Sequence, residues 1–446
     1  MNKKLVITLV VVGVIIAGTL IANTIVGSRV AESVDQQLKS MQTDDSMMLP
    51  FEFEYESVSS NPIGGSVTIH NFKIASEELD NASFKAESVE MSMPLSEILS
   101  IMNEGKKLES IHKMSIALIT AEISMDNQVM FKADEFALSY DGELSIFEIE
   151  RAEQGILPST RQSVGIRARG MRVTNVEEAL KDLDVFSDYS DSFISQLKER
   201  QDLDLQVSFD PDKKTLTIDE LSQKNGYSSM EGEGTILFTG EKVEDFEPVG
   251  GDLEISYDVN AYEMNNPMFG YISTDGGSMS LKADFKMPEG DFMELGTPSF
   301  NFEYKAKIDN FEMDLNQENL MSAAQAGIPL EDSKISIRTM EIDIEKQAGS
   351  LDLNTLKVNI KDFVNLDAYA HLEGIDEEDM IGSMASGIGV NISDAKIEIS
   401  DMSESIQELF EGFEESMPKP FPRKGGKIII ELSGDVGNPT IKGVTD

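Results

Sequence analysis

The 446-residue chain has no cysteine, no tryptophan and only three histidines, and its 37 basic residues face 81 acidic ones, giving a formal net charge of −44. The missing cysteine excludes disulfides, thiolate zinc sites, iron–sulfur clusters and cysteine nucleophiles. The shortage of lysine and arginine argues against nucleic acid as a partner, because phosphate binding needs clustered cations. An apolar share of 40% is enough for a sizeable core and disfavours wholesale disorder.

The longest run without charge lies at the N-terminus, over residues 5–27. Its 23 residues exceed the roughly 20 that a helix needs to cross a bilayer. Lys3 and Lys4 precede it, so the positive-inside rule places residues 1–4 in the cytoplasm and the bulk of the chain outside. A cleaved signal peptide and a buried soluble helix remain alternatives. The length of the run and the bulky Leu20 near the possible cleavage site favour an uncleaved anchor.

The segment 28–50 continues with helical spacing and then becomes a linker that ends at Pro50. Its apolar residues recur at intervals that place them on one helical face. These residues are Val30, Val34, Leu38 and Met41.

From residue 51 the pattern changes to alternating apolar and polar residues, which is typical of half-buried strands. The dipeptide Asp141-Gly142 predicts a type I′ hairpin turn within 136–146. A second hairpin is expected over 203–221, with its turn at 211–214. Further strands are expected over 51–58, 66–74, 83–93, 114–125, 234–240, 251–262, 278–287, 300–315, 334–345, 356–372, 391–400 and 426–434.

Sparse helices interrupt the strands, and the last is expected to open at Asp401 with Glu404 and to stop at Pro418. The expected helices cover 94–104, 175–199, 316–326, 376–386 and 402–417. Because no regular strand–helix alternation appears, the predicted class is α+β, mostly β. We expect a transmembrane helix followed by an elongated antiparallel β-sheet or groove with a few packed helices, in β-rich regions 51–200 and 201–446.

A loose echo connects three segments, 69–74, 308–313 and 360–365, which share the order apolar, polar, Asn or Asp, Phe. Strand edges alone can produce such an echo.

No motif with a catalytic mechanism appears in the chain. There is no GxSxG elbow, and His70, His112 and His371 have no partner at metal-ligand spacing. The acids Asp210 and Asp212 lack the glycine that an EF-hand loop needs, so a hairpin turn is favoured there. We therefore expect no catalytic residue, no metal and no cofactor, and a protein that is not an enzyme.

Two stretches of the chain are rich in basic residues and are called basic islands below. The first contains Arg167, Arg169 and Arg172, and the second runs from Lys419 to Lys427. Either could contact lipid headgroups or an acidic patch of a partner protein, although neutralisation of the protein's own carboxylates is the favoured interpretation. The candidate contact residues are Arg167, Arg169, Arg172, Lys419, Arg423, Lys424 and Lys427.

The order of segments in 66–126, two strands, a Pro-Leu that opens a short helix, and then GKKLESIHKMSIALITAEISM, resembles the N-terminal part of AsmA-like proteins. The closing segment 430–443, IELSGDVGNPTIKG, is similar to AsmA-like ends. The uncharged run at 5–27, together with the later segment FEYESVSS at 53–60, also resembles the YdgA-like family. These resemblances cover the two ends of the chain and leave its middle unmatched.

The resemblance implies a single-pass protein of the bacterial inner membrane with a periplasmic β-groove that binds phospholipid acyl chains. We therefore expect a role in handling lipid and supporting envelope integrity, with the bilayer contacted through 5–27. The alternative is a non-catalytic envelope scaffold or interaction protein whose core is closed. The two differ in whether the apolar face of the strands is open or covered.

Overall fold

The computed structural model describes residues 35–36, 38–39, 52–61, 65–76, 82–93, 110–125, 128–145, 148, 151–152, 154–174, 198–266, 270–287, 299–315, 317, 319–321, 333–375, 389–415 and 417–444. The chain forms two compact units. Unit 1 contains the described residues up to Gly226 together with Phe238–Glu247. Unit 2 contains Tyr227–Leu237 and the described residues from Pro248 onward.

Unit 1 is an antiparallel meander. From β2 to β9 each strand pairs with the next along the chain, and β1 shares the edge of β3 with β2. The short 3-10 helix η1 (Val243–Asp245) also belongs to this unit. The strands are β1 (Glu52–Glu54), β2 (Ser57–Asn61), β3 (Ser66–Ser76), β4 (Ala82–Ser92), β5 (Ser110–Met125), β6 (Gln128–Ser145), β7 (Gln162–Val173), β8 (Gln201–Asp210) and β9 (Thr215–Lys224).

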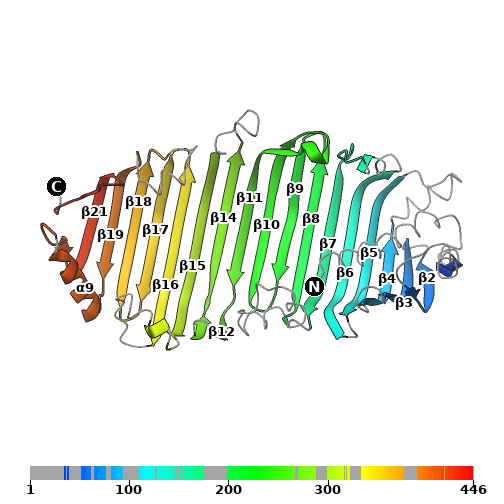
Figure 1. The fold of residues 1–446 in the computed structure, drawn as a ribbon, viewed down its shortest axis with the longest axis horizontal. Helices are drawn as coiled ribbons and strands as arrows, with labels where there is room; N and C mark the ends of the chain where they lie inside the picture. Colours follow the sequence, from blue (N-terminus) through cyan, green and yellow to red (C-terminus); the bar gives the residue numbers. More distant parts are fainter. Residues whose placement is uncertain are drawn as a thin grey trace. The chain divides into compact units, whose positions relative to one another are not determined.

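Unit 2 is also antiparallel, and its strands follow one another in the order β11, β14, β15, β16, β17, β18, β19, β21 and β22. The hairpin β12–β13 extends the sheet beside β15, and β20 pairs with β21. Figure 1 shows these strands side by side, with the helix α9 next to β21. The elements are β10 (Ser228–Thr239, mostly in this unit), β11 (Glu247–Val259), β12 (Tyr262–Asn266), β13 (Gly270–Thr274), β14 (Gly276–Lys286), β15 (Ser299–Leu315), β16 (Lys334–Gln347), β17 (Ser350–Ile360), β18 (Val364–Glu373), β19 (Asn391–Ser400), α9 (Glu404–Glu414), β20 (Arg423–Lys424), β21 (Lys427–Asp435) and β22 (Thr440–Ile441).

The alternation in the sequence gives each sheet an apolar face and a charged face, because successive side chains of a strand point to opposite sides. The register aligns apolar residues into rows that cross the strands of unit 2. One such row consists of Ile255, Leu281, Tyr304, Ile344, Leu353, Ala370, Ala395 and Leu432. The adjacent row on the other face consists of Glu254, Lys282, Glu303, Glu345, Asp352, His371 and Asp394.

Several strands contain one residue beyond strict alternation, and the paired strand advances equally there, so the two faces stay separate without a shift in register. In β3 the buried Ile69 and Phe72 are three residues apart, where strict alternation would put them on opposite faces. Asn71 between them is exposed and has a φ of 50°. The left-handed residue turns the chain locally, so that both apolar neighbours face the same side. Thr120 in β5, with a φ of 51°, and Asn310 in β15, with a φ of 46°, occupy the same kind of position.

The echo in the sequence coincides with this backbone feature. Asn71, Asn310 and Asp362 are its third residues, and all three have a positive φ. Each is followed by a phenylalanine. Asn and Asp are the non-glycine residues that tolerate the left-handed conformation best.

The packed core of the described residues lies mainly in β3–β6 of unit 1. Many apolar residues of these strands are less than 9% exposed, and Leu38, from the segment before the sheet, is fully buried. The buried set includes Ile69, Phe72, Ile74, Phe84, Val89, Met91, Met93, Ile116, Ile123 and Met130. Unit 2 has a second buried cluster at its C-terminal end, which includes Ala368, Ile392, Ala395, Ile399 and Ile428.

The structure confirms the mostly β, antiparallel character predicted from the sequence and the hairpin turn at 211–214 between β8 and β9. The turn predicted at Asp141-Gly142 is wrong, since β6 runs through it. Asp141 pairs with Lys113 on one side and with Ser163 on the other, and this pairing on both sides holds the dipeptide extended. The single strand predicted over 356–372 is also wrong, because a turn at 361–363 separates β17 from β18.

Helix α9 begins later than predicted. Its N-cap is Ser403, whose hydroxyl accepts a hydrogen bond of 3.4 Å from the Ile406 backbone N–H. Asp401, predicted to open the helix, has a φ of 50° and accepts a hydrogen bond from the side chain of Asn365. Its carboxylate is therefore already engaged across the sheet, which leaves the cap to Ser403.

The anchor predicted at 5–27 lies outside the described residues, as do the helices predicted at 94–104 and 376–386 and most of 175–199 and 316–326. Among the residues that the structure describes, no helix has the length and apolar character needed to span a membrane.

Candidate functional site

An apolar strip covers one face of five strands of unit 2: β11, β14, β15, β16 and β17. Its side chains are half-buried, and the largest exposed fractions are 37% at Met279 and 36% at Phe300. The strip consists of Leu253, Ile255, Tyr257, Val259, Met279, Leu281, Ala283, Phe285, Phe300, Phe302, Tyr304, Ala306, Ile308, Met340, Ile342, Ile344, Leu351, Leu353, Leu356 and Val358.

No apolar side chain of the strip is fully buried, in contrast to the core of unit 1. Each of β14–β17 pairs with its neighbours in the sheet. Helix α9 lies beside β21 and does not cover the strip (Figure 1). A contiguous apolar surface of this kind is typical of a surface that binds apolar ligands or another protein.

One cation interrupts the apolar strip. Lys346 of β16 is opposite Phe302 and Leu351 in the register and is only 3% exposed. Its ammonium donates a hydrogen bond of 2.6 Å to the backbone carbonyl of Phe300. A buried ammonium needs such a partner, because transfer out of water otherwise disfavours the charged group.

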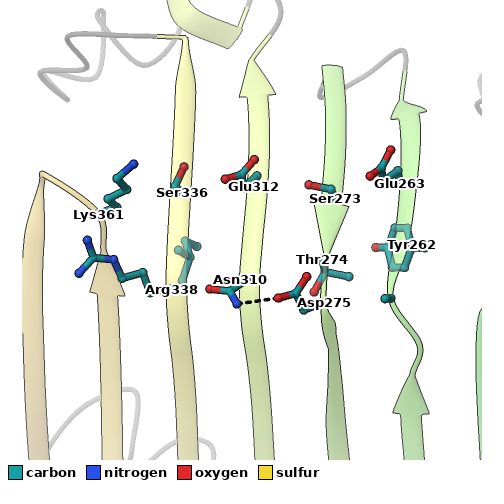
Figure 2. Close-up of a pocket in the computed structure, with 12 residues that line it drawn as sticks. Tyr262, Glu263, Ser273, Thr274, Asp275, Asn310, Glu312, Ser336, Arg338 and Lys361 are labelled. Carbon is teal, nitrogen blue, oxygen red and sulfur yellow. Dashed lines mark hydrogen bonds between the residues drawn. The ribbon is translucent and has the colours of Figure 1, made fainter.

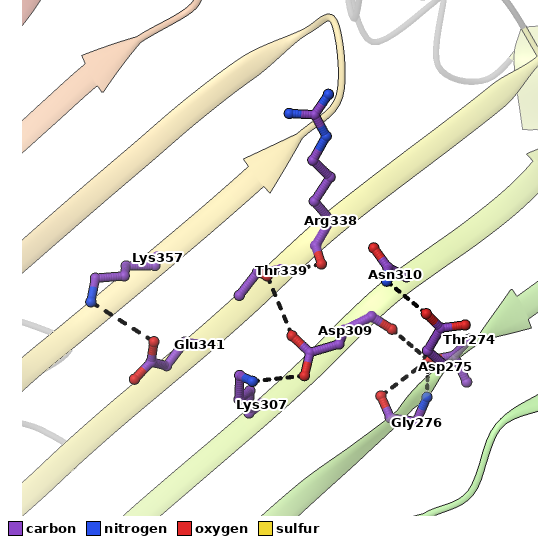
Figure 3. Close-up of polar contacts among 10 residues, drawn as sticks. All are labelled: Thr274, Asp275, Gly276, Lys307, Asp309, Asn310, Arg338, Thr339, Glu341 and Lys357. Carbon is purple, nitrogen blue, oxygen red and sulfur yellow. Dashed lines mark hydrogen bonds and ion pairs between the residues drawn. The ribbon is translucent and has the colours of Figure 1, made fainter.

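The opposite face of unit 2 carries ion pairs between neighbouring strands. Lys282 lies 2.8 Å from Glu254, and Lys357 lies 3.8 Å from Glu341. The hydrogen bond and charge of Glu254 raise the pKa of Lys282. Figure 3 shows the Lys357–Glu341 pair beside Asp309, which accepts from Lys307 at 2.7 Å. These pairs are exposed, so each contributes at most about 1 kcal/mol.

The first basic island lies on β7 and is partly neutralised by β8. Asp204 is opposite Arg167 in the register, and its carboxylate lies 3.4 Å from Arg167 Nε and 2.8 Å from Arg169 Nη2. Arg169 also donates to the carbonyls of Ala168 and Leu203, both at 3.2 Å. The hydrogen bond to Asp204 raises the pKa of the Arg169 guanidinium. Arg172, in contrast, is exposed.

The second basic island lies around β20 and β21. Arg423 Nη2 lies 2.9 Å from Glu414 Oε2 of α9, and Lys427 Nζ lies 3.4 Å from Glu398 Oε2 of β19. Lys419 and Lys424 are exposed. Arg167, Arg169, Arg423 and Lys427 thus all pair with the protein's own carboxylates. Contact with headgroups or a partner through these islands stays a prediction.

Strand pairing brings together a charged cluster that the sequence did not indicate. His371 of β18 lies between Asp352, which contacts Nδ1, and Glu373, whose Oε1 lies 3.2 Å from Nε2. The hydrogen bond with Asp352 has the largest effect and raises the pKa of His371; burial opposes it, and Glu373 raises the pKa further. The signal was missed because Asp352 belongs to the neighbouring strand, whose register is not visible in the sequence.

Nothing in the described part of the chain resembles a metal site, since no three histidine or acidic side chains are arranged around a common point. Asp210 instead accepts hydrogen bonds of 3.1 Å from the backbone N–H groups of Asp212 and Lys213. It therefore stabilises the turn between β8 and β9, as expected for an aspartate that begins a turn.

A polar pocket of about 780 Å³ lies on the charged face of unit 2. It lies across β12, β13, β15 and β16, beside the left-handed Asn310 and the register shift at Arg338. It reaches the turn after β17. Figure 2 shows Arg338 and Lys361 near one end of the labelled side chains and Glu263 near the other. The side chains that line it carry charges of both signs.

No family model matches this chain, and neither do the curated proteins or the solved structures with which it was compared.

Proposed function

We propose that this protein is a single-pass protein of the bacterial inner membrane that holds lipid acyl chains on the apolar strip of unit 2. The observation that supports it best is the strip itself, five strands wide and formed by rows whose apolar side chains are only half-buried. Such a surface is stabilised when apolar area is removed from water.

The dimensions of the strip suit one acyl chain. Four spacings of about 4.8 Å separate β11 from β17, so the strip is roughly 19 Å wide across the strands. One leaflet contributes about half of a hydrocarbon core roughly 30 Å thick, so a lipid chain needs about 15 Å. Each buried methylene contributes about 0.8 kcal/mol, so a chain lying along one row, across the strands, would be held reversibly without any polar contact.

The N-terminal segment supports a place at the membrane. An uncharged run of 23 residues after Lys3 and Lys4 has the length and the flanking charge of an anchor. The resemblance to AsmA-like and YdgA-like proteins agrees with this arrangement. In this proposal the chain performs no catalytic step, and lipid is bound and released unchanged.

Photo-crosslinking in the full-length chain tests the proposal. A benzophenone side chain replaces either Met279 or Phe300 on the strip, and matched controls replace Ser280 or Asn301, the adjacent residues on the charged face. After irradiation in cells, mass spectrometry of the purified protein should find phospholipid adducts at least five-fold more often at the two strip positions.

A scaffold with a closed core is the second candidate, and the fully buried apolar residues of β3–β6 favour it for unit 1. If the strip positions give protein adducts and no lipid adducts while the variants keep their β-sheet circular dichroism, the lipid proposal is wrong and the scaffold is favoured.

A further inference from the structure

The polar pocket on the charged face of unit 2 is built by the strands rather than by loops. Glu263, Ser273, Glu312 and Ser336 are opposite one another in successive strands and form a row across β12, β13, β15 and β16. The backbone N–H of Lys361 donates 2.8 Å to the carbonyl of Ser336, which fixes the turn after β17 at the end of the row.

A line of hydrogen bonds holds the wall of the pocket in place. The side-chain amide of Asn310 donates to Asp275 at 2.6 Å, and the hydroxyl of Thr274 lies 3.2 Å from the Gly276 carbonyl and 3.1 Å from the Asp309 carbonyl (Figure 3). Thr274 is only 7% exposed. The pocket is therefore preorganised, which lowers the free energy needed to order it around a ligand.

The two basic side chains of the pocket differ from their neighbours in lacking an acidic partner. Lys305, Lys307 and Lys357 on the same face all pair with carboxylates of the same or an adjacent strand. Arg338 and Lys361 have no carboxylate within 4 Å among the described residues, and both are exposed. In a chain of net charge −44, two adjacent cations left without partners mark a place where an anion is favoured.

Acidic groups lie farther along the same row. Glu312 is one strand away from Ser336, and Glu263 is two strands beyond Glu312. From Glu312 to Lys361 is about two strand spacings, or roughly 10 Å. A ligand with a charge-assisted hydrogen bond of about 2.8 Å at each end fits this gap when its own charges are roughly 4 Å apart.

We propose that this pocket binds a small zwitterion that carries a phosphate and a primary ammonium, the chemistry of phosphoethanolamine, either free or as a headgroup. The phosphate lies between Arg338 and Lys361, where a planar guanidinium and a point charge match its several oxygens. The ammonium donates to Glu312, and the hydroxyl of Ser336 lies between the two ends. This site is on the face opposite the apolar strip and does not depend on lipid binding there.

Calorimetric titration of the full-length chain in detergent micelles with O-phosphoethanolamine tests the site. Arg338→Gln and Lys361→Gln should each weaken binding at least ten-fold, and Glu312→Gln at least five-fold. The matched control is Lys357→Gln, which removes the same charge from the same face outside the pocket and should leave binding within two-fold. Inorganic phosphate and ethanolamine should each bind at least ten-fold more weakly than the joined molecule.

Glycerophosphoethanolamine distinguishes the two sources of this chemistry. Tighter binding of this diester assigns the site to a headgroup, and tighter binding of the monoester assigns it to a free small molecule. Equal binding of inorganic phosphate, equal weakening by Lys357→Gln, or no measurable heat with either ester from the folded protein would overturn the proposal. None of these outcomes alters the crosslinking result for the strip.

Discussion

The side-chain amide of Asn310 donates a hydrogen bond of 2.6 Å to the carboxylate of Asp275 in the bend between β13 and β14, and Asn310 itself has a φ of 46°. The same relationship joins Asn71 to Glu56 and Asn365 to Asp401, and in each pair one residue has a left-handed backbone. In the first two pairs the left-handed residue lies within a strand and its own side chain donates the bond, which holds it at the point where the alternation is reset. Apolar side chains therefore stay on one face of the sheet and charged side chains on the other, both before and after that position.

Substitution of Asn310 tests this relationship. Asn310→Ala loses the hydrogen bond and leaves alanine, which tolerates the left-handed region less well than asparagine does, so we expect a loss of about 2 kcal/mol in the free energy of unfolding. Asn310→Gly should lose about half as much, because glycine adopts this φ without strain. Urea unfolding followed by circular dichroism measures both.

Asn301→Ala is the matched control for this substitution. Asn301 donates to Asp284 at 2.8 Å from a regular part of the same strand β15. Its loss should be about 1 kcal/mol or less. Equal losses for Asn310→Ala and Asn301→Ala would show that the left-handed backbone contributes nothing.

His371 makes the stability of unit 2 depend on pH. Its pKa is raised in the folded chain by Asp352 and then Glu373, and Asp394 of β19 is opposite it in the register. A raised folded pKa means that the contribution is fully present below the unfolded value of about 6.5 and is lost as the pH rises through the folded value. The side chain is 38% exposed, so screening keeps the contribution below about 1 kcal/mol.

The difference in unfolding free energy between the natural chain and His371→Gln should therefore be larger at pH 5.5 than at pH 9. Denaturant melts at both values measure it. A difference that stays constant between the two pH values would rule out an ionic role for His371.

Two tyrosines with similarly raised pKa values should differ in their effect on stability. Burial raises the pKa of Tyr55 to about 12, helped by the carboxylate of Asp35, and burial raises the pKa of Tyr140 to about 12, helped by Glu148. The hydroxyl of Tyr55 donates 2.9 Å to Asp35 Oδ1. The hydroxyl of Tyr140 is buried and has no hydrogen-bond partner among the described residues.

Tyr55→Phe should lower the free energy of unfolding by about 1–2 kcal/mol, since it removes the hydroxyl that donates to the carboxylate and the carbonyl of Asp35 and leaves Lys39 as the remaining donor to that carboxylate. Tyr140→Phe should leave the free energy unchanged or raise it slightly, because it removes an unsatisfied polar atom. Thermal unfolding of both variants checks the order. In an absorbance titration at alkaline pH, each substitution should remove one tyrosine whose pKa is raised.

Arg169 should contribute to stability and Arg172 should not. Arg169 donates to Asp204 and to two backbone carbonyls, whereas Arg172 is exposed on the same strand. We expect Arg169→Gln to lower the free energy of unfolding by about 1–2 kcal/mol and Arg172→Gln by less than about 0.5 kcal/mol. Chemical denaturation of both variants decides between a structural role and a free basic surface, and equal effects would contradict the assignment.

The sequence indicates most strands because alternation depends only on which face each side chain takes. Prediction from alternation fails where pairing with neighbouring strands decides whether a segment turns or stays extended. Asp141-Gly142 has the composition of a hairpin turn, but strands on both sides pair through it. The turn at 361–363 is hidden because Ile360 and Phe363 have the same i, i+3 spacing as Ile69 and Phe72, which lie within one strand.

The candidate sites depend on register, which a single sequence does not reveal. The apolar strip follows from the alternation once the strands are aligned, so its members were predictable even though their rows were not. The partners of Arg169, His371 and Asn310 lie in neighbouring strands, 19 to 35 residues away in the chain. The i, i+3 spacing of Ile69 with Phe72 and of Ile308 with Phe311 was the one local sign of the extra residues.

The meander order has a consequence for how the protein acquires its structure. From β2 to β9, and from β14 to β19, each strand pairs with the one synthesised just before it. Pairing can therefore advance hairpin by hairpin while the chain is still emerging, without waiting for a distant partner. The same order allows a sheet to be extended by whole hairpins. Insertion of one more hairpin would widen a sheet by about 10 Å and leave the register of all the other strand pairs unchanged.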